Sequence, residues 1–167
     1  IQMCNRFFND LKNKEYEFKP KDAEFVIQII EKTFVHDKGE RLDGSPLRGE
    51  PFLLEAWQKF IIYNILGFFL KGTRIRRFKE VFIYLPRKNG KTRFVAALSW
   101  ALSLLERKSG SSIYIVGAAL RQAKQSFDFI HYNLKEMGED DNFRILANNQ
   151  ESSISGDLGD GSLSIEA

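Results

Sequence analysis

The chain has 167 residues and a mass of 19.3 kDa; 43% of its residues are hydrophobic and 28% are charged, as in an ordinary globular domain with one core. The lone Cys4 excludes an internal disulfide, and His36 and His131 lack Cys or carboxylate partners at zinc-site spacing. Apolar runs are too short to span a bilayer and no signal peptide opens the chain, which predicts an intracellular protein without a membrane partner.

Helices are expected in most of the first 70 residues. Residues 1–20 suggest a short leading helix or arm, and residues 21–35 repeat apolar side chains at helical spacing. Residues 37–49 are rich in Gly, Asp and Arg and predict a loop. Another helix is expected over residues 54–70.

The net charge of +3 is unevenly distributed, because residues 71–93 are strongly basic and contain Glu80 as their single acidic residue. Such a block favours polyanions as partners. For Arg74, Arg76 and Arg77 a role in nucleic-acid binding and a role in a solvated hairpin or loop remain open. The basic residues are Lys71, Arg74, Arg76, Arg77, Lys79, Arg87, Lys88, Lys91 and Arg93.

A phosphate-binding loop is expected between residues 85 and 92. Residues 81–85 are β-branched or aromatic and predict a strand, which Pro86 ends because proline cannot donate to a sheet ladder. From Thr92 onward, apolar residues recur at helical spacing. Backbone N–H groups at the start of that helix would bind an anion, with Lys91 on the terminal phosphates and the Thr92 hydroxyl on Mg²⁺.

The loop departs from the usual P-loop pattern at one position. Leu85 stands where a glycine is expected, five residues before Gly90. Gly90 itself lets the main chain approach the phosphates closely. A basic turn between two core elements without a nucleotide is the alternative interpretation.

After this loop, the pattern alternates between strands and helices. A strand is expected at 113–116 and a helix at 120–137, with weaker strand signals at 143–147 and 162–165. This order predicts an α/β fold with a mostly parallel sheet and helices on both faces. Ligands of such sheets bind at the carboxyl ends of the strands, where the loop after Leu85 falls.

Four segments of the chain belong together: Glu55-Ala56-Trp57-Gln58, Leu66-Gly67, residues 76–81 and Pro86-Arg87-Lys88-Asn89-Gly90-Lys91-Thr92. Taken together they resemble the large terminase subunit of tailed double-stranded DNA bacteriophages, and the match covers roughly residues 51–135. The resemblance implies a RecA/ASCE-like P-loop NTPase fold and an ATPase motor that uses ATP and Mg²⁺ to pump double-stranded DNA into a procapsid. It also implies a separate C-terminal endonuclease domain, a portal protein, a small terminase subunit and an oligomer as partners, and the cytoplasm of the infected bacterium as location.

The resemblance assigns roles to individual residues. The deviant Walker A motif corresponds to residues 85–92, so that Pro86, Arg87, Lys88, Asn89, Gly90, Lys91 and Thr92 would bind nucleotide, with Arg87 and Lys91 acting catalytically on the phosphates. Trp57 and Gln58 resemble an adenine-recognition motif, although core packing of Trp57 is an equal alternative. Arg121 and Gln122 resemble a segment that faces DNA or nucleotide in related motors.

The expected domain organisation follows from what the sequence lacks. No apolar run after Thr92 ends in Asp-Glu, the pair needed to hold Mg²⁺ and polarise the attacking water. We therefore expect a helical arm and loop at 1–50 and the front part of a truncated ATPase domain at 51–167, which turns over ATP negligibly alone. A helicase-like P-loop ATPase and a basic nucleic-acid-binding module without a nucleotide site remain the alternatives.

Overall fold

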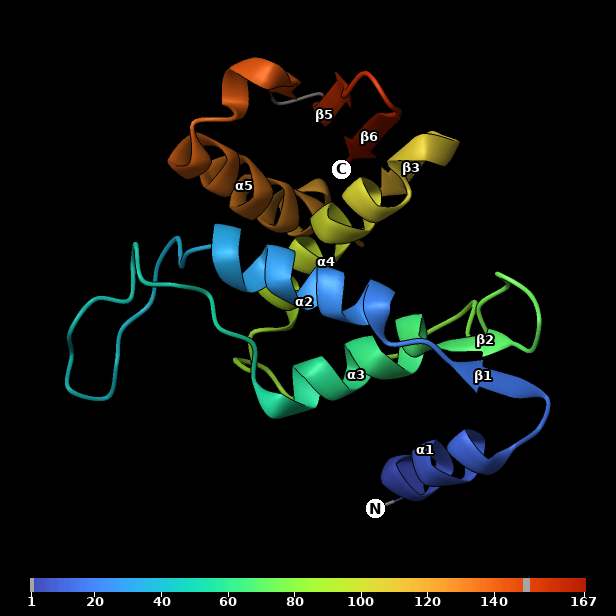
Figure 1. Cartoon of the computed structure of the whole chain (residues 1–167). Coiled ribbons are helices and arrows are strands. Elements are labelled where there is room, and N and C mark those ends of the chain that lie inside the picture. The colour runs from blue at the N-terminus through green and yellow to red at the C-terminus, as the bar shows by residue number, and fades with distance from the viewer. Residues whose placement is uncertain (1, 149–150) are drawn as a thin grey trace. The chain divides into compact units, whose positions relative to one another are not determined.

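The computed structural model describes residues 2–148 and 151–167, which form a mixed α/β structure of two compact units (Figure 1). Unit 1 comprises residues 1–28 and 54–85, and unit 2 comprises residues 29–53 and 86–167. Helix α2, Lys21–Thr33, contributes its first residues to unit 1 and its last residues to unit 2. The sequence predicts a different division, between an N-terminal arm at 1–50 and an ATPase domain at 51–167. The two compact units do not test that division, so it stays a prediction.

Unit 1 is helical with a small antiparallel sheet. It contains α1 (Gln2–Lys12), β1 (Tyr16–Phe18), α3 (Ala56–Gly67) and β2 (Phe68–Leu70), and β1 pairs with β2. The core is aromatic, because the Phe68 ring centroid lies 5.2 Å from that of Phe7 and 4.9 Å from that of Phe18. Gly67 is required beside this cluster, since a Cβ at that position would lie 2.4 Å from Phe18 Cε2. Only a hydrogen fits there.

Unit 2 contains a four-stranded sheet in the order β3-β6-β5-β4. The strands are β3 (Ser111–Tyr114), β4 (Arg144–Ala147), β5 (Ser152–Asp157) and β6 (Ser162–Glu166). Strands β3 and β6 are parallel, whereas β4 and β5 and then β5 and β6 are antiparallel. A row of isoleucines in register crosses the sheet, formed by Ile113, Ile165, Ile154 and Ile145.

Two helices pack on one face of this sheet and against each other. They are α4 (Lys91–Leu105) and α5 (Leu120–Met137), and Figure 1 shows them side by side next to the strands. Short 3-10 turns at Arg107–Ser109 (η1) and Asp140–Asn142 (η2) follow the helices. In β6, Leu163 and Ile165 are buried on one face of the strand, whereas Ser162 and Glu166 on the other face are exposed. Among the described residues, none covers this second face at those two positions.

The sheet corrects one prediction from the sequence. It is mixed rather than mostly parallel, and its helices cover one face of the described strands rather than both. The reason is the short connections: only a few residues separate β4 from β5 and β5 from β6, which permits hairpins, whereas parallel strands need a long crossover. The parallel pair is the one whose strands are far apart in sequence, β3 and β6.

Residues 81–85 correct a second prediction, because they do not form a strand. Val81, Phe82 and Tyr84 are 50%, 89% and 84% exposed, and no described strand pairs with this segment. Strand propensity is a local property, whereas a strand also needs a neighbour to receive its hydrogen bonds. The helix expected over 54–70 is also shorter, because residues 68–70 pair with β1 as β2.

Other sequence predictions are confirmed. Helices occupy 2–12, 21–33, 91–105 and 120–137, the last ending at Gly138 in the left-handed conformation. Strands occupy 144–147 and 162–166, as expected. The strand expected at 113–116 lies at 111–114 instead, and Val116 is outside it and 90% exposed. Strands β1 and β5 were not predicted from the sequence.

Candidate functional site

The loop before α4 has the conformation of a tight turn that ends at a helix N-terminus. Lys88 and Gly90 both have φ of 68°, and the Asn89 side-chain amide donates to the Pro86 carbonyl oxygen over 3.2 Å. The Phe94 N–H donates to the Gly90 carbonyl oxygen over 3.0 Å, which closes the first turn of α4. The N–H groups of a first helical turn have no carbonyl partner within the helix, and they are suited to an anion.

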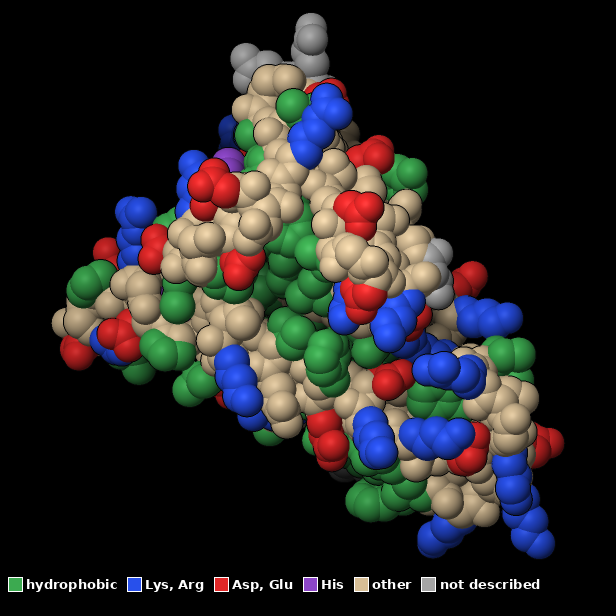
Figure 2. All heavy atoms as spheres, turned by 45° about the horizontal axis from the view of Figure 1, so that its top comes forward, with side chains coloured by type: hydrophobic (Ala, Val, Ile, Leu, Met, Phe, Trp, Pro, Cys, Tyr) green, Lys and Arg blue, Asp and Glu red, His purple; other side chains and the backbone are tan. Residues whose placement is uncertain are grey.

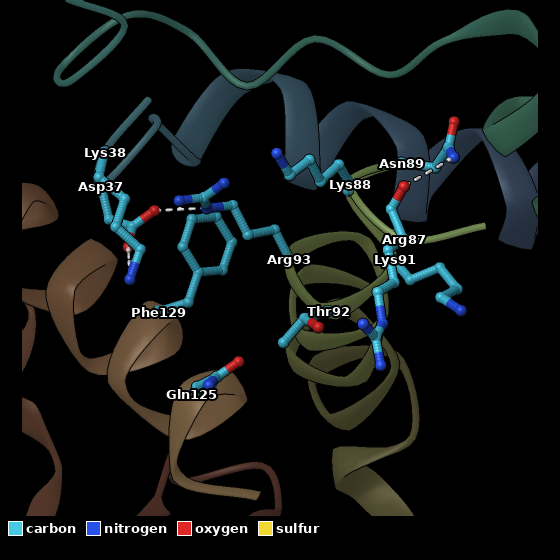
Figure 3. Close-up of a pocket in the computed structure, with 11 residues that line it drawn as sticks. Asp37, Lys38, Arg87, Lys88, Asn89, Lys91, Thr92, Arg93, Gln125 and Phe129 are labelled. Atoms are coloured by element: carbon cyan, nitrogen blue, oxygen red, sulfur yellow. Dashed lines mark hydrogen bonds and ion pairs between the residues drawn. The ribbon is translucent and has the colours of Figure 1, made fainter. Parts of the chain in front are cut away.

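A pocket of about 330 Å³ lies at this helix start, entirely within unit 2 (Figure 3). Five cationic side chains line it against a single carboxylate, that of Asp37. Its walls come from three segments, namely the loop and first turn of α4, residues 37–38, and α5. The lining residues are Asp37, Lys38, Arg87, Lys88, Asn89, Gly90, Lys91, Thr92, Arg93, Gln125 and Phe129.

The side chains of the first helical turn point in different directions (Figure 3). Arg93 points toward Asp37, whereas Arg87 and Lys91 lie on the other side of Thr92 in that view. Thr92 and the loop residues Arg87, Lys88 and Gly90 are exposed. An exposed hydroxyl between cationic side chains on either side is a suitable place for a metal-bound anion.

Residues 34–36 lead into Asp37 on the pocket wall, and several interactions hold this segment. The Val35 N–H donates to Asn133 Oδ1 of α5 over 2.7 Å, and the His36 N–H donates to the Glu50 carbonyl oxygen over 2.9 Å. The His36 ring packs edge-on against Phe52 at 5.0 Å. Burial, and then the charge of Arg93, lower the pKa of His36, so the imidazole is neutral at pH 7.

The expected adenine-recognition residues lie in unit 1. Gln58 is buried at 5% exposure, and its side-chain oxygen accepts a hydrogen bond from the Glu55 N–H over 2.8 Å. This bond is half of a capping box that starts α3. Trp57 is half-buried on the same helix. The structure thus gives Gln58 a role in helix capping, and an adenine role for the pair stays a prediction.

The arginines proposed for DNA contact have unequal environments. Arg74 is exposed, Arg76 lies 3.8 Å from the carboxylate of Asp22, and Arg77 forms an ion pair with the buried Asp10. Arg121 and Gln122 are exposed in the first turn of α5. On the face drawn in Figure 2, basic and acidic side chains are intermixed. DNA contact by these residues stays a prediction.

Several residues of the pocket were not predicted from the sequence. Asp37 and Lys38 lie in a segment whose composition predicts only a loop, and Arg93 belongs to the basic block without a further signal. Asp37 is separated from Arg93 by 56 residues, so that tertiary structure alone brings them together. Gln125 and Phe129 did leave a signal, because they are four residues apart on one helix and therefore share a face.

Within residues 2–148 and 151–167, no group of three or more His, Cys, Asp or Glu side chains could hold a metal ion. Likewise, no described helix is long and apolar enough to cross a membrane.

Comparison with known protein families places this pocket in context. Residues 56–155, more than half of the chain, match the family model of the terminase large subunit, ATPase domain. The chain belongs to this family. The terminase match begins with α3, contains the pocket loop, α4 and α5, and ends within β5. No curated protein and no solved structure matches the chain significantly.

Membership of the terminase family confirms the resemblance drawn from the sequence. It indicates an ATPase domain with a role in DNA packaging, and it implies the use of a nucleotide. The mixed α/β structure is compatible with such a domain.

Proposed function

We propose that the pocket of unit 2 binds ATP with Mg²⁺, and that the chain is the ATP-binding part of a large terminase that couples ATP hydrolysis to DNA translocation into a procapsid. One observation carries this proposal: within a matched terminase ATPase sequence, an exposed turn at a helix N-terminus is surrounded by five cationic side chains and one carboxylate. A triphosphate is the ligand whose charge fits such an excess.

Each side chain of the loop has a role in this proposal. Lys91 contacts the β and γ phosphates, and the Thr92 hydroxyl ligates Mg²⁺. Arg87 stabilises the charge that develops as the γ phosphate leaves. Pro86, Lys88, Asn89 and Gly90 shape the turn that receives the phosphates, and in the structure the Asn89 amide already ties this turn together.

The motor function requires DNA and partner proteins. Among the candidate residues, Arg74, Arg121 and Gln122 have exposed side chains and are the ones we propose for contact with double-stranded DNA. A portal protein, a small terminase subunit and further copies of the chain complete the proposed motor. We expect this chain to turn over ATP negligibly by itself, because no apolar run after Thr92 ends in the Asp-Glu pair that hydrolysis needs.

The direct test is nucleotide binding by a Lys91→Ala variant. Calorimetry with a non-hydrolysable ATP analogue and Mg²⁺ should show binding by the unmodified chain, and the variant should bind at least about 100-fold more weakly. Lys108→Ala is the matched control, because this exposed lysine lies in η1 beyond the other end of α4. Equal affinity of the Lys91→Ala and Lys108→Ala variants would exclude a nucleotide site in this pocket.

DNA binding separates the motor from a basic module that has no nucleotide site. If the pocket is a nucleotide site, Lys91→Ala should leave the binding of double-stranded DNA unchanged. If the basic stretch acts only through its charge, neutralising Arg76 should weaken DNA binding more than Lys91→Ala does. A gel-shift titration at fixed salt distinguishes the two outcomes.

A further inference from the structure

The ion pair between Arg93 and Asp37 lies on the wall of the pocket opposite Lys91. Arg93 Nε donates to Asp37 Oδ1 over 2.5 Å, and both residues line the pocket. Their side chains are 26% and 19% exposed, so the pair is partly shielded from water. A guanidinium group has five N–H donors in a planar fork, and the Nε–H is only one of them.

Asp37 is held in place by structure that does not depend on Arg93. The Val35 N–H binds the fully buried Asn133, and the Gly49 N–H donates to the His36 carbonyl oxygen over 2.9 Å. The Phe52 N–H donates to the Phe34 carbonyl oxygen over 2.8 Å. A carboxylate on such a fixed segment can orient a flexible arginine side chain at little further cost in entropy.

Arg93 and Lys91 approach the pocket from different directions. Successive residues of an α-helix are rotated by about 100°, so two residues that are two positions apart lie on nearly opposite sides of the axis. Figure 3 shows this arrangement, with Arg93 directed toward Asp37 and Lys91 beyond Thr92. A triphosphate bound over the first turn of α4 would therefore meet a cation on each side.

We propose that Arg93 is a further phosphate-binding residue and that Asp37 is its positioning residue, an inference that rests on the proposed nucleotide site. Asp37 holds the Nε edge of the guanidinium group and leaves its two terminal amino groups to face the phosphates. The carboxylate therefore acts through hydrogen-bond geometry more than through its charge. Asparagine at position 37 keeps an oxygen acceptor without the charge, whereas alanine removes both, so the two substitutions separate the two contributions.

The test measures the affinity of variants at Arg93 and Asp37 for a non-hydrolysable ATP analogue with Mg²⁺ and for inorganic tripolyphosphate. Arg93→Ala should lower the affinity for both ligands about tenfold, as expected for the loss of charge-assisted hydrogen bonds. Arg93→Lys should lower it nearly as much, because an ammonium group cannot bind Asp37 and phosphate in the same fork geometry. Asp37→Ala should weaken binding several-fold, and Asp37→Asn should stay within about twofold of the unmodified chain.

Asp160→Asn is the matched control. Asp160 forms the corresponding ion pair with Arg107 in the same unit, at 2.8 Å from Nε, outside the pocket. This variant should bind both ligands as the unmodified chain does. It removes the same charge from unit 2 and so reports any effect of net charge alone.

Two results would overturn the proposal. An Arg93→Ala variant with unchanged affinity would show that Arg93 does not touch the phosphates. Tighter binding by both Asp37→Ala and Asp37→Asn would show that Asp37 competes with the ligand for Arg93 instead of orienting it. Lys91→Ala distinguishes these failures from failure of the nucleotide site: if Lys91→Ala abolishes binding while Arg93→Ala does not change it, only the role of Arg93 is wrong.

Discussion

Two groups of arginine and lysine residues from the same basic stretch of sequence have opposite surroundings. In unit 1, the Arg77 guanidinium group pairs with the buried carboxylate of Asp10 and lies 4.2 Å from the ring centroid of Tyr16. In unit 2, Arg87 and Lys88 are exposed in a pocket with a large excess of positive charge. A cluster of charged residues in a sequence therefore does not reveal which of them stabilise the fold and which are available to a ligand.

The two groups differ in how many carboxylates lie beside their cationic side chains. Arg77 is matched by one carboxylate and covered by aromatic rings, which suits a group that stabilises the fold. The pocket contains one carboxylate, and Arg93 already binds it. Cations that the protein itself leaves in excess are the ones expected to bind an external anion.

The largest effect on stability is expected from Arg77→Ala. Removal of one partner leaves the Asp10 carboxylate buried without its cation, which costs about 3–5 kcal/mol of unfolding free energy. Urea unfolding followed by the fluorescence of Trp57, in a Trp100→Phe background, measures this loss in unit 1. Nucleotide binding to the remaining folded protein should be unchanged.

Arg74→Ala is the control for Arg77→Ala. Its side chain is exposed in the same segment, so the substitution should change the unfolding free energy by less than about 0.5 kcal/mol. Similar losses for the two variants would show that the buried ion pair is not what distinguishes them.

The sequence could predict the turn before α4 because its signals are local. Proline, glycine and a change from strand-like to helical spacing fix the turn and the start of α4 within a few residues. The start of α2 after Pro20 and the end of α5 at Gly138 were predicted for the same reason. Local propensity failed at residues 81–85, where the side chains suit a strand but no described strand supplies the hydrogen bonds.

The far wall of the pocket and the mixed sheet could not be predicted in this way. Asp37 reaches Arg93 only because Asn133 and Glu50 fix the segment before it, and these contacts join residues far apart in sequence. Strand direction depends likewise on which strands become neighbours, and β6 lies between β3 and β5 only in the folded sheet. Neither feature leaves a periodic signal in the chain.

An intermediate effect is expected from Gly90→Ala. Gly90 has φ of 68° with nothing within 4 Å of an added Cβ, so the cost is conformational, about 1 kcal/mol of unfolding free energy. Gly138→Ala is the matched control, because it has the same φ and the same open space at the end of α5. Both variants should lose similar stability, measured by Trp100 fluorescence in urea, but only Gly90→Ala should weaken nucleotide binding.

This pair of glycine variants tests whether the turn itself, and not only its charges, belongs to the site. If Gly90→Ala binds the ATP analogue as tightly as Gly138→Ala does, the conformation of the loop at residue 90 does not matter for the ligand. The excess charge of the pocket would then be the whole basis of binding.

The smallest effect is expected from the titration of His36, which lies beside Asp37 in the wall of the pocket. Burial is the main cause that lowers its pKa; Arg93 and Arg41 lower it further, and Asp37 and Glu50 oppose them. Because the folded-state pKa is below the unfolded value, the unfolded chain takes up the proton more readily. The stability contributed by neutral His36 is therefore present above about pH 6.5 and is lost as the pH falls through and below that value.

Unfolding in urea at about pH 7.5 and about pH 5.5, followed by Trp100 fluorescence, measures this loss. His36→Gln should reduce the acid sensitivity of unit 2, and His131→Gln should reduce it separately, because burial also lowers the pKa of His131. Only His36 adjoins the pocket, so only His36→Gln should also change the pH dependence of nucleotide affinity in this range. An identical change in the pH dependence of affinity with His131→Gln would mean that acid acts on the whole unit, and that nucleotide binding is not sensitive to the charge of His36 in particular.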